Sequence, residues 1–373
     1  MKNKNVLLLL LLTTLICISN LSCTDTNNLE VEKVKVGVIL PMTGNAADYG
    51  NVFWNGCKAA IEKLGNDSKI ELKLEDSKAD PKTAISATQK LINYDGVKVI
   101  LGALSPVMLA ITPVAEPSKT VVINPVANSP KLSGISNYLF NTTPLSNEES
   151  EFLANLAFKT YNKTKAAVLY INNESGLGFR NNFSKTFEKL GGEIVYEEAI
   201  PLGKSGFREI ILKLQKANPD IIFLATYYRE SALIIKQSKE LQYSPPLWLT
   251  YSAIETPEFL KLVSGAADGI IYSYSGFNKT TNNSKEFINI YKRLFGKEPD
   301  IWSGQFYEAV ILLNNVIKGL PDTDNIGSDI INILSTNKID GLSGEIGFDE
   351  NHSVKGRFLL KTIKNNTFVF QES

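Results

Sequence analysis

The chain has 373 residues, of which 43% are hydrophobic and 21% are charged, and its 39 lysines and arginines balance 39 aspartates and glutamates. That even charge excludes a dedicated nucleic-acid binder, which would carry a basic excess, and the apolar fraction excludes a disordered chain. The length allows about two to three domains with cores of their own, while three cysteines are too few for a disulfide-stapled scaffold.

The first 22 residues have the pattern of a secretory signal. Lys2 and Lys4 precede an apolar stretch over residues 6–18, and a basic start followed by an apolar run of this size is typical of a signal peptide. The 13-residue stretch is shorter than the ~20 apolar residues that a membrane-spanning helix needs. We therefore predict that residues 1–22 are a signal peptide and that the mature chain lies outside the cytoplasm.

A cysteine follows this predicted signal directly. Ser22 and Cys23 form a junction that resembles the bacterial lipoprotein signal, with Asn20 where that pattern has an aliphatic residue. The resemblance implies that Cys23 is lipidated and that residues 23–33 tether the protein to a bacterial membrane, in the periplasm or at the cell surface. The alternative is a secreted protein in which Cys23 has no special role. Cys57 is then the remaining thiol, which we predict to be a buried small apolar residue.

From residue 34 onward, short β-branched runs alternate with longer amphipathic stretches. Alternation of this kind predicts βαβ units and parallel sheets covered by helices on both faces. The rhythm restarts near residue 146, where Ser146 is the predicted N-cap of a helix, so we expect two similar α/β lobes. The predicted strands are 34–40, 70–75, 97–101, 120–123, 166–170, 193–199, 220–225, 247–250 and 269–274, and the predicted helices are 50–64, 81–93, 106–115, 146–161, 178–190, 207–216, 230–241, 284–295 and 303–318.

Signatures of catalysis are missing from the sequence. His352 is the single histidine, lies in a polar stretch and is predicted to sit in a solvated turn, so Cys–His catalysis and His/Cys zinc sites lack partners. No G-x-S-x-G elbow, P-loop or H-E-x-x-H motif occurs, and Gly176–Gly178 reads as a tight strand-to-helix turn. We expect a protein that is not an enzyme and that uses no cofactor and no metal.

Loops at the ends of the predicted strands carry the candidate site. Ligands of open α/β sheets bind beyond the carboxyl ends of the strands, so two facing sheets predict a cleft lined by these loops. Ser105, as a predicted N-cap followed by Pro106, would form an anion site at a helix start. Aromatic residues with a few polar groups suit a small amphipathic ligand. The alternatives are that Tyr49 packs on its own lobe and that Ser105 only caps its helix.

Residues 36–44, 49–50, 76–84, 102–105, 124–125, 176–179, 227–230, 307–309 and 341–349 form a series of motifs that spans most of 34–370. In this order they resemble the periplasmic binding proteins of the branched-chain amino acid type. The resemblance implies a type I periplasmic binding protein fold, with two doubly wound parallel-sheet lobes joined by a three-strand hinge. Lobe I would comprise residues 34–145 and 276–357, and lobe II residues 146–275 and 358–373.

The resemblance also implies a set of ligand-binding residues. Ser105 matches the serine that holds the ligand carboxylate, and Tyr49 and Tyr227 match an aromatic residue from each lobe. Asn128 replaces a threonine of the family pattern, and Ser175 replaces an aromatic residue. The implied contacts are Tyr49, Ser105, Val126, Asn128, Ser175, Tyr227, Ser252 and Trp302.

Ser252 is the main departure from the family pattern, because amino-acid binders place an acid near it to pair with the ligand ammonium. Losing one partner of a buried ion pair costs about 3–5 kcal/mol, against about 8 kcal/mol for a whole micromolar site. Either Glu230 or Glu255 therefore supplies the acid, or the ligand has no ammonium group.

The predicted function is capture of a small ligand, a branched-chain or other amino acid, by hinge closure and its delivery to an ABC importer. The expected partners are the ligand, a membrane permease and, through Cys23, the membrane, with no nucleic acid, and the protein is expected to be a monomer. Alternatives are a receptor for a non-amino-acid carboxylate, an amide or a urea-like molecule, and a sensor without a transport role. A eukaryotic receptor ectodomain is a further alternative, since Asn141, Asn162 and Asn278 lie in glycosylation sequons.

Overall fold

Two β-sheets organise the chain. The structure is a computed structural model that describes residues 33–321, 325–342 and 344–371, so the predicted signal peptide, Cys23 and the tether up to residue 32 lie outside the described residues. The first sheet has five strands and the second has seven, and a separate hairpin has two. We call the first sheet with the helices packed on it lobe I, and the second sheet with its helices lobe II. Within the described ranges, no helix is long and apolar enough to cross a bilayer.

Lobe I is built on a fully parallel sheet in the order β2-β1-β3-β4-β5. Its inner strands are runs of aliphatic residues that are buried almost throughout, as expected of a parallel sheet with helices on both faces. The strands are β1 (Val34–Leu40), β2 (Ile70–Asp76), β3 (Val99–Gly102), β4 (Val121–Asn124) and β5 (Leu139–Asn141).

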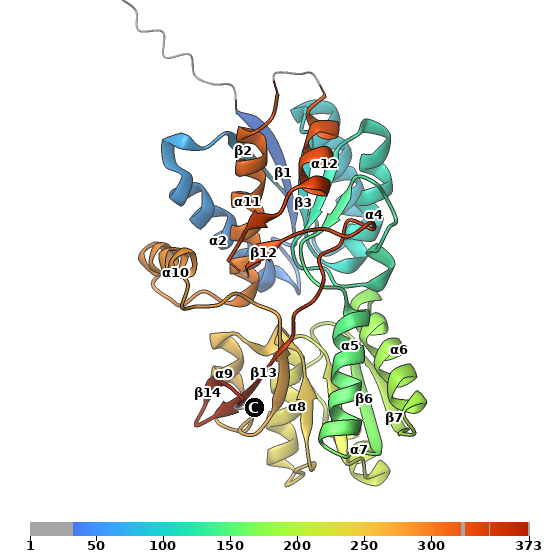
Figure 1. The fold of residues 1–373 in the computed structure, drawn as a ribbon. Helices are drawn as coiled ribbons and strands as arrows, with labels where there is room; N and C mark the ends of the chain where they lie inside the picture. Colours follow the sequence, from blue (N-terminus) through green and yellow to red (C-terminus); the bar gives the residue numbers. More distant parts are fainter. Residues whose placement is uncertain (1–32, 322–324, 343, 372–373) are drawn as a thin grey trace, which may run out of the picture. The chain divides into compact units, whose positions relative to one another are not determined.

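Helices from two distant parts of the chain cover this sheet. The first three alternate with its strands, whereas three later ones return to it, α10 and α11 against α2 and α12 against α11 and β4 (Figure 1). The close approach of α2 to α11 requires Gly56, because a Cβ atom there would lie 2.2 Å from the carbonyl oxygen of Ser303. The helices are α2 (Ala47–Leu64), α3 (Pro81–Lys90), α4 (Ser105–Ala115), α10 (Asn282–Phe295), α11 (Ile301–Lys318) and α12 (Ile326–Thr336), and the hairpin is β11 (Ile339–Asp340) with β12 (Glu345–Ile346).

Lobe II has a mixed sheet in the order β14-β13-β10-β9-β8-β6-β7. Five strands are parallel to one another, β13 adds to the edge antiparallel to β10, and β14 pairs antiparallel with β13. The strands are β6 (Lys165–Ile171), β7 (Glu193–Ile200), β8 (Ile221–Ala225), β9 (Trp248–Thr250), β10 (Ile271–Tyr274), β13 (Leu359–Lys364) and β14 (Thr367–Phe370). The helices are α5 (Ser146–Asn155), α6 (Glu174–Lys189), α7 (Arg208–Ala217), α8 (Tyr228–Glu240) and α9 (Pro257–Val263).

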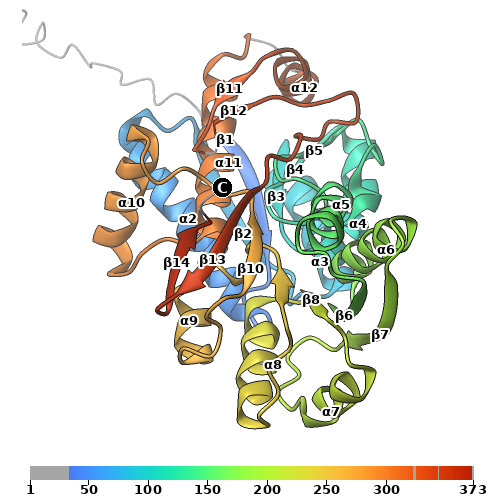
Figure 2. The ribbon, with the colours of Figure 1, turned by 60° about the horizontal axis from the view of Figure 1, so that its bottom comes forward.

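The chain passes three times between the lobes, after β5, after β10 and before β13 (Figure 2). The start of α5, just after the first crossover, holds the other two. Glu148 Oε2 accepts a hydrogen bond from the backbone N–H of Gly356 at 3.0 Å, in the third crossover. Glu149 Oε1 accepts one from the hydroxyl of Ser273 on β10 at 2.6 Å, just before the second. The three connections therefore form one hydrogen-bonded hinge.

The predicted fold class is confirmed, and each predicted strand and helix has a counterpart. The predicted cap at Ser146 is wrong, because Ser146 is already helical and its buried hydroxyl has no hydrogen-bond partner. Gly176–Gly178 lie inside α6, which Asn173 caps by accepting a hydrogen bond from Gly176 N–H at 3.0 Å. The alternating pattern missed β5, α9, α12, the β11–β12 hairpin, β13 and β14. Most of these are too short to show a periodic pattern.

The surroundings of Cys57 and His352 test two further predictions made from the sequence. Cys57 is fully buried, as predicted, and burial raises the pKa of its thiol strongly. The solvated setting predicted for His352 is wrong. Its ring stacks on Phe140 with 4.2 Å between centroids and 5° between planes, in a turn where its φ is 54°. Partial burial lowers the pKa of His352.

Candidate functional site

A small cavity lies where strand ends of the two lobes face each other. Its volume is about 40 Å³, which is room for only a few water molecules. The loops after β1, β3 and β4 line it from lobe I, together with the start of α11, and those after β6, β8 and β9 line it from lobe II. The lining residues are Tyr49, Phe53, Leu104, Ser105, Val126, Ala127, Asn128, Ser175, Tyr227, Tyr251 and Trp302.

Seven of the eight predicted contact residues are brought together at this cavity, and Ser252 is the exception. Ser252 is buried in the short turn Ser252–Ile254, and the preceding residue, Tyr251, lines the cavity instead. The sequence also missed Phe53, which follows Tyr49 by four residues on α2. That spacing puts both rings on one face of the helix and was the available signal.

Ser105 lies at the polar end of the cavity, at the start of α4. It is not the N-cap of that helix, as predicted, but its first residue. The cap position belongs to Leu104, whose φ is 70°. Ser105 is 1% exposed, and its hydroxyl accepts a hydrogen bond from Ser129 N–H at 3.2 Å. A helix start offers unpaired N–H groups and a positive dipole end, which together favour an anion such as a carboxylate.

Aromatic rings from both lobes form the walls. The ring of Tyr49 lies 5.4 Å from that of Tyr227, 5.2 Å from that of Tyr228 and 5.2 Å from that of Trp302, measured between centroids. Burial, with a contribution from the nearby Glu230, raises the pKa of Tyr49 well above its usual value. The Tyr49 hydroxyl is buried and has no hydrogen-bond partner. Buried polar groups in native proteins are normally paired, so this hydroxyl is suited to a polar group of a ligand.

A hydrogen bond closes one side of the cavity by joining the lobes. The Ser175 hydroxyl of lobe II donates to the amide oxygen of Asn128 in lobe I. Behind it, Asn173 donates to the Tyr227 hydroxyl at 3.1 Å, and burial raises the pKa of Tyr227 to about 12. Asn128 and Ser175, two of the three site positions at which the sequence departs from the family pattern, are therefore bonded to each other.

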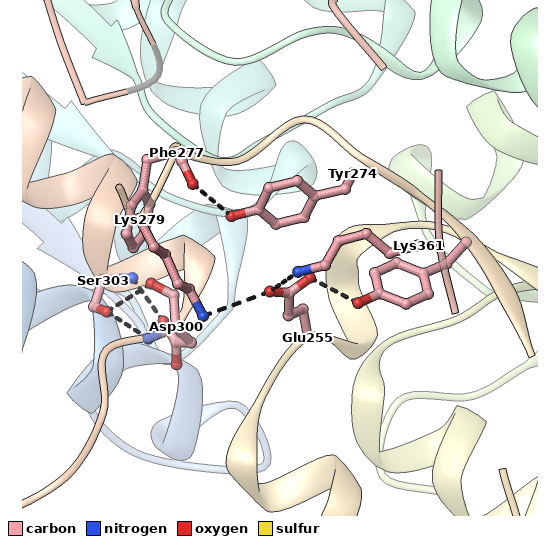
Figure 3. Close-up of polar contacts among 8 residues, drawn as sticks. Glu255, Tyr274, Phe277, Lys279, Asp300, Ser303 and Lys361 are labelled. Atoms are coloured by element: carbon pink, nitrogen blue, oxygen red, sulfur yellow. Dashed lines mark hydrogen bonds and ion pairs between the residues drawn. The ribbon is translucent and has the colours of Figure 1, made fainter. Parts of the chain in front are cut away.

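Glu255, one of the two predicted ammonium partners, is bonded elsewhere (Figure 3). Its Oε1 lies 2.5 Å from the ammonium of Lys361 and 3.7 Å from that of Lys279, and its Oε2 accepts from the Tyr272 hydroxyl at 2.8 Å. The side chains of Glu255 and Lys361 are only 4% and 6% exposed. Glu255 is not among the residues that line the cavity.

Glu230, the other predicted partner, lies behind the aromatic wall. It is buried, and its Oε1 accepts a hydrogen bond from Gly203 N–H at 2.8 Å, while its Oε2 has no hydrogen-bond partner. Burial raises its pKa, and its charge contributes to the raised pKa values of Tyr49 and Tyr227. Glu230 therefore lies beside the rings without lining the cavity, and its role toward a ligand stays a prediction.

The described ranges were also compared with the arrangements of side chains that hold metal ions. No group of three or more His, Cys, Asp or Glu side chains there is arranged to hold a metal ion. The cavity lining consists of aromatic and aliphatic groups with hydroxyls and one amide. This arrangement can bind and orient a small molecule.

Comparisons with known proteins agree with this geometry. A family model described as "Periplasmic binding protein" matches residues 33–367. A leucine-, isoleucine-, valine-, threonine- and alanine-binding protein of Pseudomonas aeruginosa is 24% identical over 335 residues, covering 88% of this chain and 89% of that protein.

Two crystal structures are similar at 27% sequence identity. A leucine-binding protein of Thermotoga maritima has a TM-score of 0.80, with 91% of this chain and 98% of that chain covered. An ABC-transporter solute-binding protein of Rhodopseudomonas palustris, in complex with 3,4-dihydroxybenzoic acid, has a TM-score of 0.81, with 89% and 93% covered.

Proposed function

The chain belongs to the periplasmic binding protein family, and from this premise we propose that it is a solute receptor which closes around a small carboxylate and delivers it to an ABC importer. The observation that carries the ligand class is the cavity lining, which combines a helix start with aromatic walls and contains no charged side chain. The helix start at Ser105 accepts the carboxylate, and the rings accept an apolar body.

The missing acid favours a carboxylate without an ammonium group. An ammonium enclosed here would face hydroxyls and rings, and burying a charge without a partner is costly. Glu255 is already neutralised by Lys361, and Ser252 provides no charge. Aromatic monocarboxylates meet these requirements, and the R. palustris protein binds one of them.

A branched-chain amino acid is the second candidate. The unpartnered Oε2 of Glu230, close to the rings of Tyr49 and Tyr227, is the observation that favours it. This carboxylate would pair with the ligand ammonium. Leucine is bound by the T. maritima relative according to its description. Small amides and urea-like molecules are further candidate ligands.

Ligand entry requires the lobes to separate. A cavity of about 40 Å³ is far smaller than the roughly 300–1,000 Å³ of typical ligand sites. The ligand would bind first to lobe I, at Ser105 and Tyr49, and lobe II would then cover it by hinge closure. Only a ligand that binds the closed state better than the open state shifts this equilibrium.

The setting of the receptor is part of the proposal. Residues 1–22 act as a signal peptide, Cys23 carries the lipid, and residues 23–33 hold the lobes near a membrane permease. The proposal keeps residues 34–145 with 276–357 as lobe I and 146–275 with 358–373 as lobe II, and it includes a monomeric state and no catalysed reaction. Metabolic labelling with a radioactive fatty acid tests the anchor, because a Cys23→Ala variant should lose the label.

A thermal-shift screen tests the ligand class. Benzoate, 4-hydroxybenzoate, isoleucine, valine, small amides and urea are added to the purified protein, and each hit is confirmed by isothermal titration calorimetry. A ligand at a hundred times its dissociation constant should stabilise the protein by about 2.7 kcal/mol. We expect the benzoates to stabilise it and the amino acids to have no effect. The reverse result would select the second candidate, and no effect from any of these compounds would overturn the proposed ligand class.

A further inference from the structure

Three ion pairs join lobe II to lobe I or to the crossover that leads back to lobe I. All three have the positive charge on the same side. In each pair the lysine belongs to lobe I or the crossover, and the glutamate belongs to lobe II. The other ion pairs of the described ranges each join two groups of the same lobe. The three pairs are Lys131–Glu174 at 2.8 Å, Lys297–Glu258 at 3.4 Å and Lys279–Glu255 at 3.7 Å.

Two of these pairs lie on opposite sides of the cleft. Glu174 begins α6, next to the cavity residue Ser175, and pairs with Lys131 in the loop between β4 and β5. Glu258 lies on α9, which follows β9 and precedes β10 in the chain and lies toward the other side of the lobe II sheet. It pairs with Lys297, just before α11. Figure 1 shows α6 and α9 at opposite edges of lobe II.

The side chains of these two pairs are accessible to water. Lys131 and Glu174 are 68% and 31% exposed, and Lys297 and Glu258 are 40% and 41% exposed. They can therefore separate without leaving a buried charge behind. The Glu255–Lys361 pair differs because both of its partners are buried within lobe II.

We propose that these pairs form an electrostatic clasp that favours the closed lobes before a ligand arrives. In each pair the lysine and the glutamate carry opposite charges, so they still attract each other when the lobes begin to part. The attraction acts over roughly the Debye length, about 10 Å at 0.1 M salt.

The size of the effect is suited to adjusting a hinge equilibrium. An exposed ion pair changes an equilibrium constant by a factor of roughly 1.4 to 5, so the two exposed pairs together change the closed-to-open ratio by a factor of roughly 2 to 25. The affinity of a ligand for a closed state depends on how much of that state is populated. The clasp therefore sets the apparent affinity without contacting the ligand. It goes beyond the proposed function but rests on the hinge closure assumed there.

Small-angle X-ray scattering without ligand measures how far the lobes open, and therefore tests the clasp. The radius of gyration of the purified protein is compared at about 0.01 M and about 1 M salt, between which the Debye length falls from about 30 Å to about 3 Å. We expect wild type to expand as salt is added. The Lys131→Glu/Lys297→Glu variant replaces attraction with repulsion, so it should be expanded at low salt and become more compact as salt is added. Adding Glu174→Lys and Glu258→Lys should restore the wild-type response.

The matched control reverses a charge within one lobe. Arg293 pairs with Glu62 inside lobe I, so Arg293→Glu should leave the radius of gyration and its salt response unchanged. If the double reversal unfolds the protein, as judged by circular dichroism, Lys131→Met/Lys297→Met replaces it and should lose most of the salt response. Equal salt responses in wild type and either variant would overturn the clasp. Failure of the ligand screen, by contrast, would overturn the ligand class and leave this result standing.

Discussion

Glu149 provides a quantitative test, because it is a buried acid at the hinge. Its side chain is 3% exposed, and the Ser273 hydroxyl donates to its Oε1 at 2.6 Å. Burial raises the pKa of Glu149 to about 7, and the hydrogen bond from Ser273 partly offsets this. In the unfolded chain the same group has its ordinary pKa of 4.5. The folded protein therefore favours the protonated form.

The sign and size of the pH effect follow from this difference. A group whose pKa is raised on folding stabilises the protein at low pH, and that stability is lost as pH rises from about 4.5 to about 7. At about 1.4 kcal/mol per pKa unit, the loss amounts to about 3 kcal/mol. A Glu149→Gln variant keeps a neutral, hydrogen-bonding side chain at every pH. Its free energy of unfolding should match that of wild type near pH 5 and exceed it by up to about 3 kcal/mol near pH 8.5.

Urea unfolding at several pH values between about 5 and 8.5 measures this difference. Glu151, which is exposed on the same helix, supplies the control, since Glu151→Gln should show no pH-dependent difference from wild type. Asp300, whose pKa burial raises to about 6, acts in the same direction in both proteins. It therefore cancels in the comparison of variant and wild type. A Glu149→Gln difference that is the same at all pH values would refute the reasoning.

Three further predictions concern the site and its supports. Ser105→Ala should weaken ligand binding at least tenfold in calorimetry with little change in melting temperature, and an unchanged affinity would remove the anion site. Lys361→Met should cost about 3–5 kcal/mol in urea unfolding, because Glu255 stays buried without its main partner. Adding Glu255→Gln should recover part of that loss, and purely additive effects would contradict the coupling. Glu230→Gln should leave benzoate affinity within about twofold, and a tenfold loss of isoleucine affinity would instead select the amino-acid candidate.

Local patterns in the sequence were enough to predict the fold class. The runs at 34–40 and 220–225 are mostly apolar, with the charged residues Lys35 and Asp220 near their starts, and such strands are typical of a sheet that is covered on both faces. The alternation of strands and helices then predicted parallel sheets, and the positions of strand ends predicted which loops form the site. Tyr49, Ser105 and Tyr227 meet at one cavity for this reason.

Interactions between distant residues could not be predicted in the same way. The sequence shows that Glu255 is an acid near a strand end, but not that Lys361, 106 residues later, already binds its carboxylate. Capping at Ser105 and Ser146 was predicted wrongly, because the backbone N–H of Ser129 takes up the Ser105 hydroxyl and Ser146 is packed against Gly178. Each of these outcomes depends on a partner that only the tertiary fold brings near.

The sequence by itself determined the two α/β lobes, the loops that meet between them and the absence of an acid at Ser252, because periodicity and strand ends are local properties of the chain. Only the tertiary structure decided that Glu255 is already paired with Lys361 and that Tyr251 replaces Ser252 in the cavity wall. It also decided that the lysines and glutamates of the clasp face each other. The physical reason is that charge pairing and burial depend on distances through space, which the order of residues along the chain does not fix.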